Sequence, residues 1–184
     1  MVFALSGKKT LLVGADLRRP KIFTDFELSN DHGISSYLTN LSDVDNILQT
    51  TNIENLDLLG SGPVPPNPSE LLMNPKMDDL MTQLKKRYEY IILDTPPIGL
   101  VTDAFILMKH ANLSIYLIRQ NITPKGTIKN AQEMYENGQL NNVCLLFNDV
   151  KVQKYGYGYG YGYNYGYNNG YYSESAHKRS KHKV

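Results

Sequence analysis

The first 150 residues alternate between short apolar runs and segments with helical hydrophobic spacing. Apolar runs of four to eight residues bounded by turn signals are typical of buried strands. Such runs predict strands at 10–13, 53–59, 90–94, 113–118 and 142–147. Helices are predicted at 33–38, 69–72, 74–87, 102–110 and 124–137, after a first helix that ends at Ser6-Gly7. This alternation favours an α/β fold with a parallel sheet covered by helices on both faces.

One predicted strand, at 90–94, ends on a carboxylate. Asp94 is followed by Thr95-Pro96-Pro97, and adjacent prolines prevent both further ladder pairing and an immediate helix. Asp94 is therefore expected at the carboxyl end of its strand. Ligands bind at this edge of open α/β sheets, where a carboxylate can hold magnesium beside nucleotide phosphates. The alternative is that Asp94 only caps the following turn.

A second carboxylate follows the predicted strand at 10–13. The segment Gly14-Ala15-Asp16-Leu17-Arg18-Arg19-Pro20 places one acidic and two guanidinium groups at that strand end. Asp16 could hold a metal or accept a proton from a nucleophile, and the forked groups of Arg18 and Arg19 match phosphate oxygens. The alternative is an ordinary exposed Asp–Arg pair.

Three further polar features have both a functional and a plain structural interpretation. The stiff, proline-rich loop at 60–68 could dock against a neighbouring subunit or the nucleotide rim, or could simply connect two elements. Asp103 stands at a helix start, where capping is favoured over catalysis. Asn148 follows an apolar strand and could contact a purine through its amide, although Asn148-Asp149 is also ordinary turn chemistry.

The composition changes after residue 150. We expect a globular domain at 1–150 and a tail at 151–184 that is too poor in aliphatic residues to form a core. The domain carries 13 Lys and Arg against 17 Asp and Glu, whereas the tail carries 6 against 1. A mildly acidic body is thus joined to a basic tail, and the overall net charge of +1 conceals this difference.

Several classes of function receive no support from the sequence. No apolar run reaches the roughly 18 residues that span a bilayer, and a secretory signal pattern is missing, so the chain itself is predicted to be cytoplasmic. Cys144 lies within an apolar run and is predicted to be a buried structural thiol. The histidines have no ligand spacing, which excludes a zinc site, and His32 and His110 are expected in surface segments.

The tail contains 9 of the 14 tyrosines, most of them alternating with glycine. Glycine at every second position weakens a strand, so we expect this segment to be disordered. The tyrosines could accept phosphoryl groups, each adding about −1.5 to −2 charges, or could form a sticky low-complexity tail. The candidate acceptors are Tyr155, Tyr157, Tyr159, Tyr161, Tyr163, Tyr165, Tyr167, Tyr171 and Tyr172.

Taken together, five motifs and the tyrosine cluster resemble the bacterial tyrosine kinases of capsular and exopolysaccharide synthesis. The motifs are LLVGADLRRP at 11–20, GPVPPNPSELL at 62–72, ILDTPP at 92–97, VTDA at 101–104 and FND at 147–149, with the tyrosine cluster at the end. The resemblance covers nearly the whole chain. It implies a deviant P-loop NTPase fold, ATP and Mg²⁺ as cofactors, and phosphorylation of the chain's own tyrosine cluster.

The resemblance also assigns roles to individual residues. Asp94 matches the Walker B carboxylate that holds magnesium through water, and Asp16 matches the second carboxylate of Walker A′. The first carboxylate of Walker A′ is replaced by Gly14. Arg18 and Arg19 would steady phosphates or a subunit contact, and Asn148 matches a base-contacting position. Catalysis is thus expected from Asp16, Asp94 and Arg18, and metal binding from the two carboxylates.

The Walker A loop of the family is missing from the sequence. The segment Gly7-Lys8-Lys9-Thr10 does not replace it, because a P-loop needs a glycine five positions earlier, where Val2 stands, and a preceding strand. We therefore expect a domain that lacks its first strand and P-loop, begins late in the following helix, and binds ATP weakly or not at all.

The resemblance implies partners as well. Phosphorylation would pass between subunits of a ring-like homo-oligomer. A membrane-embedded chain-length regulator would act as activator and hold the kinase at the inner face of the plasma membrane. Nucleic-acid binding is not expected, because the chain shows no structured basic groove. Two other functions stay open: a partition-type ATPase without a tyrosine acceptor, and a non-catalytic phospho-acceptor or interaction protein.

Overall fold

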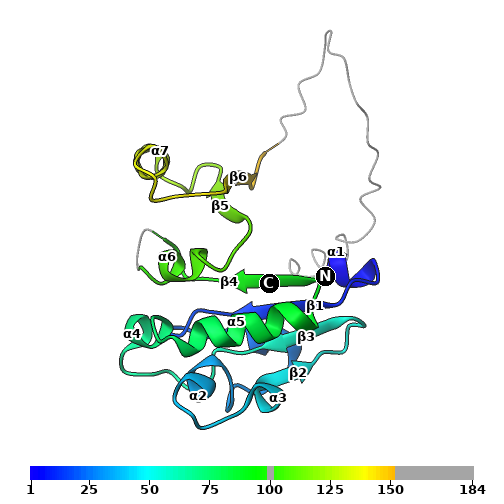
Figure 1. Cartoon of the computed structure of the whole chain (residues 1–184). Helices are drawn as coiled ribbons and strands as arrows, with labels where there is room; N and C mark the ends of the chain where they lie inside the picture. The colour runs from blue at the N-terminus through cyan, green and yellow to red at the C-terminus, as the bar shows by residue number, and fades with distance from the viewer. Residues whose placement is uncertain (99–101, 152–184) are drawn as a thin grey trace, which may run out of the picture. The chain divides into compact units, whose positions relative to one another are not determined.

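The computed structural model describes residues 1–98 and 102–151. The predicted tyrosine tail lies outside the described residues, apart from its first residue, Lys151, and so do all nine candidate acceptor tyrosines. Figure 1 shows the order of the elements along the chain. The compact unit Met1–Val150 contains every helix and strand described below.

A four-stranded sheet forms the centre of this unit. Its order is β2 (Leu48–Thr50), β3 (Leu56–Leu59), β1 (Thr10–Gly14) and β4 (Tyr90–Asp94). β1 runs parallel to β3 and to β4, which confirms the predicted α/β class with parallel pairing. The short strand β2 was not predicted, and it pairs antiparallel with β3 at the sheet edge.

The last two predicted strands form a sheet of their own. β5 (Ser114–Arg119) and β6 (Val143–Asn148) pair in parallel, joined by a crossover that contains α7 (Lys125–Glu136). In the described part of the chain, β4 is paired only with β1, and β5 only with β6. The predicted strands are thus present but are divided between two sheets.

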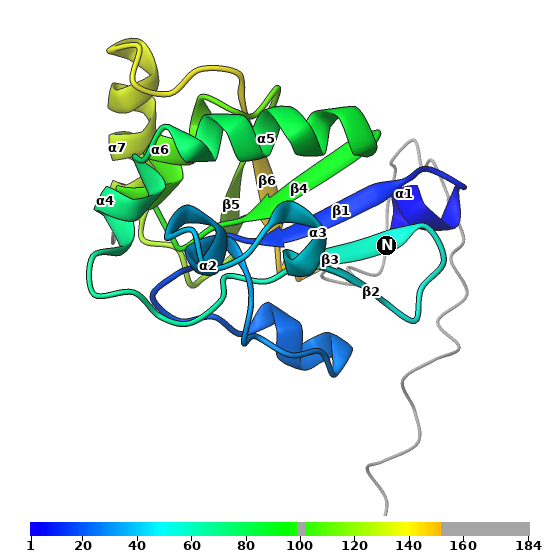
Figure 2. The ribbon, with the colours of Figure 1, turned by 60° about the horizontal axis from the view of Figure 1, so that its bottom comes forward.

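The main hydrophobic core lies between the four-stranded sheet and α5 (Lys76–Arg87). This helix buries four residues at helical spacing, namely Met77, Leu80, Met81 and Leu84. Figure 2 shows α5 lying along one face of the sheet, and alternate residues of β1, Leu11 and Val13, meet it there. The charged residues of α5 face outward, so the predicted amphipathic helix is confirmed.

The first helix, α1 (Val2–Leu5), ends as predicted at a glycine. Gly7 adopts φ +81°, its N–H donates to the Ala4 carbonyl, and the Lys8 N–H donates to the Phe3 carbonyl. These two bonds form a Schellman C-cap. Phe3 also stacks on Tyr90 of β4, with ring centroids 4.1 Å apart, so α1 contacts the sheet.

The remaining helices are short and surround the carboxyl ends of β1 and β4 or connect the strands. They include one 3₁₀ helix and four α-helices, of which α4 begins with a proline, as helix starts permit. Their bounds are η1 (Ile22–Phe26), α2 (Ile34–Leu38), α3 (Val44–Ile47), α4 (Pro68–Leu72) and α6 (Asp103–Met108). None of the helices in the described ranges has both the length and the apolar character needed to cross a bilayer.

Two predictions about single residues are wrong. Cys144 is exposed rather than buried, because the apolar run that contains it lies in a two-stranded sheet whose β6 side chains are largely uncovered. His110 was expected at the surface, but its side chain is only 8% exposed. It follows α6, whose Leu107 belongs to the main core, so the end of this helix is drawn inward.

Candidate active site at the carboxyl ends of β1 and β4

The two strands that carry the predicted carboxylates lie side by side and end together. Gly14 is in register with Asp94, and the Ala15 N–H donates to the Asp94 carbonyl at 2.8 Å. Asp16 is therefore two residues beyond the strand end that Asp94 occupies. The topology brings both carboxylates to the edge where open α/β sheets bind ligands, as the sequence predicted for their strands.

The carboxylate of Asp16 is oriented by the loop that follows it. Its Oδ1 accepts the backbone N–H groups of Arg18 and Arg19 at 3.0 and 2.9 Å. This is the geometry of an Asx turn. The other oxygen makes no hydrogen bond or ion pair found within the described residues, so one oxygen of Asp16 fixes the turn and one is left for a ligand.

Asp94 combines partial desolvation with a nearby negative charge. Desolvation, followed by the charge of Asp16, raises the pKa of the Asp94 carboxyl above its ordinary value. A cation bound between the two carboxylates would reverse this effect, and carboxylate oxygens are the ligands that Mg²⁺ prefers. Within the described residues, no group of three or more acidic, histidine or cysteine side chains could hold a metal. The remaining ligands of a cation would come from water or phosphate.

By the resemblance described above, Gly14 would stand in place of the first Walker A′ carboxylate. The residue is buried, and a Cβ added there would lie 2.6 Å from Cγ2 of Ile22 and 3.6 Å from Oγ of Ser61. The contact with Ile22 is too close for any side chain unless Ile22 moves. Local packing around η1 is therefore matched to glycine at this position.

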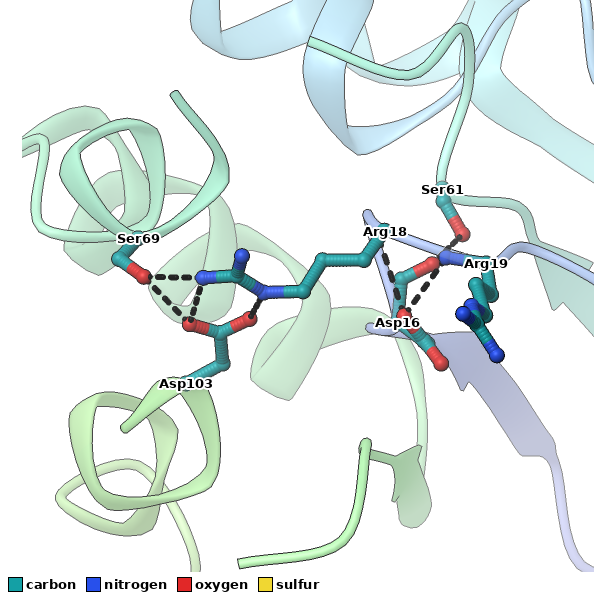
Figure 3. Close-up of polar contacts among 6 residues, drawn as sticks. All are labelled: Asp16, Arg18, Arg19, Ser61, Ser69 and Asp103. Carbon is teal, nitrogen blue, oxygen red and sulfur yellow. Dashed lines mark hydrogen bonds and ion pairs between the residues drawn. The ribbon is translucent and has the colours of Figure 1, made fainter. Parts of the chain in front are cut away.

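The guanidinium group of Arg18 points away from Asp16 and binds Asp103 of α6. Its Nε donates to Oδ2 at 2.9 Å and its Nη2 to Oδ1 at 3.2 Å, while Nη2 also donates to Oγ of Ser69 at 2.7 Å. The hydroxyl of Ser69 in turn donates to Oδ1 of Asp103 at 2.6 Å (Figure 3). Arg18 is thus occupied by protein groups in this structure.

Asp103 is neither a helix cap nor free for catalysis. The cap position of α6 is Thr102, which makes no capping hydrogen bond through its side chain, and Asp103 is the first helical residue. Its side chain is completely buried. Burial opposes its ionisation, but the hydrogen bonds from Arg18 and Ser69 and the charge of Arg18 outweigh this and lower the pKa of the carboxyl. Asp103 thus stands at a helix start, as predicted, but its carboxylate binds Arg18 and Ser69 instead of capping the helix.

The two remaining candidate residues have exposed side chains. Arg19 makes no side-chain hydrogen bond or ion pair found within the described residues, and Figure 3 shows its guanidinium group separate from that of Arg18. Asn148 ends β6 in register with Arg119, and its carbonyl accepts the Gln120 N–H at 3.0 Å. Their roles toward phosphate and base stay predictions.

The proline-rich loop is anchored at both of its ends. At its start, Oγ of Ser61 donates to the carbonyls of Gly14 and Asp16 at 2.9 and 3.0 Å. At its end, Ser69 joins the Arg18–Asp103 contact. The loop is therefore more than a connector, because both ends bind the segment that carries Asp16.

Ser61 and Ser69 were missed as site residues by the sequence analysis. A serine in a Gly- and Pro-rich stretch has the composition of any loop, and no spacing relates it to a partner 45 or 34 residues away. The one available signal was that Ser69 follows a proline at a helix start, where unpaired backbone N–H groups favour polar side chains.

No protein-family profile matches the chain, but individual proteins do. It is 40% identical over 160 residues to the tyrosine-protein kinase YwqD of Bacillus subtilis, which covers 85% of this chain and 68% of YwqD. It is 38% identical over 157 residues to the tyrosine-protein kinase CpsD of Streptococcus pneumoniae, covering 84% of this chain and 69% of CpsD.

Solved structures give the same relationship. The kinase domain of the Escherichia coli tyrosine kinase ETK has a TM-score of 0.77 and 32% identity, and the match covers 88% of this chain and 64% of that domain. The cell-division ATPase MinD of Pyrococcus furiosus has a TM-score of 0.61 at 19% identity, which shows a shared fold alone.

The matches with the tyrosine kinases extend over most of this chain. The chain spans 58 to 70% of the length of four such kinases from Bacillus, Staphylococcus and Streptococcus, and a smaller share of the longer ones from Klebsiella and Escherichia. By its sequence and its fold, the chain belongs to the family of bacterial tyrosine-protein kinases.

Proposed function

We propose that this chain carries part of the phosphoryl-transfer site of an ATP-dependent tyrosine autokinase that regulates capsule or exopolysaccharide synthesis and export. One observation carries the proposal. Asp16 and Asp94 lie together at the carboxyl edge of β1 and β4, and neither is in an ion pair within the described residues. Two adjacent carboxylates without a protein cation are suited to a divalent metal.

In this proposal the two carboxylates hold Mg²⁺, with Asp94 acting through a water ligand. The metal, when bound, neutralises charge on the transferred phosphate of ATP. Asp16 keeps one oxygen fixed by the Arg18 and Arg19 amides, which leaves the second for the metal or for an acceptor hydroxyl. The exposed guanidinium of Arg19 meets a phosphate or a neighbouring subunit, and Asn148 contacts the base.

The acceptors in this proposal are the clustered tyrosines at 155–172. Transfer between subunits of a ring-like homo-oligomer would deliver a tail to a neighbour's site. The tail is basic, with 6 Lys and Arg against 1 Glu, so three to four phosphates of about −1.5 to −2 charges each would reverse its sign. A membrane-embedded activator would hold the assembly at the inner face of the plasma membrane.

The sequence lacks the loop that would bind the phosphates of a nucleotide. Gly7-Lys8-Lys9-Thr10 ends helix α1 through its Schellman cap, whereas a phosphate-binding glycine loop opens a helix. No other Gly-Lys-Ser/Thr loop occurs in the sequence. We therefore expect weak ATP binding by the 184-residue chain. Isothermal titration with Mg-ATP tests this, and magnesium-dependent binding in the micromolar range would contradict it.

Mapping of phosphotyrosine in the chain isolated from its own cells tests the function. We expect phosphate within 155–172, and we expect Asp94→Asn in the intact kinase to abolish it. Asp79→Asn, an exposed carboxylate on α5, serves as the matched control. Loss of labelling in Asp79→Asn as well would mean that the Asp94 effect is not specific.

The same experiment separates the two alternatives. An unmodified tail in cells that make the capsule would favour a partition-type ATPase, whose fold the chain shares with MinD at 19% identity. Phosphate on the tail that persists in Asp94→Asn would favour a non-catalytic acceptor modified by another kinase.

A further inference from the structure

A closed triangle of hydrogen bonds connects three segments that are distant in sequence. Arg18 lies 51 residues from Ser69 and 85 residues from Asp103, yet all three side chains bind one another (Figure 3). The guanidinium binds both carboxylate oxygens, and two-point contacts of this kind fix orientation as well as distance. The triangle joins the Asp16 loop to the start of α4 and the start of α6.

The burial of Asp103 makes this arrangement stringent. Its side chain is 0% exposed, whereas that of Arg18 is 38% exposed. A buried carboxylate that loses its cation is left with an uncompensated charge. Lysine would keep the charge but could not make the two-point contact. The position of residue 18 is therefore set by the buried carboxylate.

Arg18 also contacts the catalytic carboxylate through its backbone. The Arg18 N–H donates to Oδ1 of Asp16 while its side chain is held by Asp103. On the other side of Asp16, the Ser61 hydroxyl donates to the carbonyls of Gly14 and Asp16. Asp16 is thus held between Ser61 and Ser69, the two ends of one proline-rich loop.

We propose that Arg18, Ser69 and Asp103 are positioning residues that hold the carboxylate of Asp16 in one orientation by connecting its loop to the proline-rich segment and to α6. Pro63, Pro65, Pro66 and Pro68 restrict the backbone between the two serines. A displacement of this loop is then passed to Asp16 from both sides. The functional meaning of this orientation rests on the proposed phosphoryl-transfer site, but the positioning itself does not.

Amide hydrogen exchange tests the positioning directly in the whole chain, without nucleotide. In Arg18→Lys, the amides of residues 18 and 19 should exchange roughly tenfold faster, as expected when a charged hydrogen bond of about 1.4 kcal/mol is lost. Ser69→Ala should produce a smaller increase at the same amides. The matched control is Arg19→Lys, because Arg19 makes no side-chain hydrogen bond or ion pair found within the described residues.

A double-mutant cycle separates positioning from general stability. Asp16→Asn weakens the acceptor of the same two amides, so its effect and that of Arg18→Lys should be clearly less than additive. The amides of α5 exchange through global unfolding, so their exchange rates should depend only on the overall stability of each variant. Additive effects, or an increase spread evenly over α5 and the Asp16 loop, would overturn the proposal.

Asp103→Asn should increase exchange at the amides of residues 18 and 19 more than Ser69→Ala does. If Asp103→Asn does not fold, the Ser69→Ala measurement decides. The outcome is also independent of the proposed kinase activity. Faster exchange in Arg18→Lys together with an unphosphorylated tail would refute the proposed function but support the positioning role. A phosphorylated tail together with unchanged exchange in Arg18→Lys would support the function but refute the positioning role.

Discussion

At the scale of single residues, buried groups at the edges of the site are fixed by their immediate neighbours. Gly14 is the clearest case, because the missing side chain is replaced in space by Ile22. A carboxylate at this position, as the resemblance leads us to expect, would have no room unless Ile22 moved.

Introducing a carboxylate here with Gly14→Asp should therefore destabilise the chain, by about 1–3 kcal/mol as for other overpacked positions. Because the close contact is with Cγ2 of Ile22, Ile22→Ala should recover part of that loss when the two changes are combined. Urea unfolding followed by circular dichroism measures both. Equal destabilisation by Gly14→Asp with and without Ile22→Ala would show that the steric explanation is incorrect.

His110 should make stability depend on pH near neutrality. Burial, followed by the charge of Lys109, lowers the pKa of His110, and the nearby Asp78 only partly offsets this. Its Nε2 makes no hydrogen bond within the described residues, although Oδ1 of Asp78 is 3.4 Å away. The unfolded chain, with a histidine pKa of about 6.5, thus binds this proton more tightly than the folded chain does.

Stability should consequently fall as the pH is lowered from 7.5 through about 6.5, and level off once the folded pKa is passed. His110→Gln should remove this part of the pH dependence, whatever it does to stability at pH 7.5. His32→Gln makes the same substitution at an exposed histidine and serves as the control for it. Urea midpoints between pH 5 and 7.5 measure the slope, and an identical slope in His110→Gln would contradict the assignment.

At the scale of elements, several helices and strands could be predicted from local patterns alone. The amphipathic helix α5, the buried strand β1 and the C-cap at Gly7 could all be predicted, because spacing and turn residues encode them directly. The placement of Asp16 and Asp94 at the carboxyl ends of β1 and β4 could be predicted for the same reason.

Features that depend on distant partners could not be predicted. β2 follows α3 without a break and has three residues, so its pairing depends on β3 rather than on its own pattern. The contact between Arg18 and Asp103 spans 85 residues. The alternation of strands and helices predicted a parallel sheet without fixing the order of its strands. In the described ranges, β4 and β5 each have one edge without a strand partner.

The exposure of β6 leads to a prediction about chemistry at its thiol. Cys144 is the single cysteine of the chain and is exposed, so a maleimide should label it stoichiometrically in the folded protein. The rate should approach that measured in urea, because little of the side chain is covered. Labelling that requires denaturant would restore the buried thiol predicted from the apolar run.

At the scale of the whole molecule, stability should be unevenly distributed over the unit at 1–150. The main core joins β1, α5 and α6, whereas Ile118, Ala131 and Leu140 are the buried apolar residues of the β5–α7–β6 segment. Several large apolar side chains of that segment are instead exposed, among them Ile115, Leu117, Leu145 and Phe147. Segments with few buried contacts open at lower free energy.

Within the unit at 1–150, limited trypsin digestion should therefore cut first in the segment 111–150, at Arg119, Lys125 or Lys129. Cleavage within α5, which also ends in three basic residues, should come later. Mass spectrometry of the early fragments identifies the sites. Simultaneous cleavage in both regions would show that they unfold as one cooperative unit.

The burial of Tyr88 makes this tyrosine a poor site for phosphorylation in the folded domain. Tyr88 is 8% exposed, its hydroxyl donates to Oδ2 of Asp57 at 2.8 Å, and desolvation and that hydrogen bond raise its pKa far above the ordinary value. A phosphate there would have to replace a buried hydrogen bond with two negative charges beside a carboxylate. A phosphate on Tyr88 would therefore mark chains that were unfolded when they were phosphorylated. An antibody against phosphorylated Tyr88 would measure the amount of such chains in the cell.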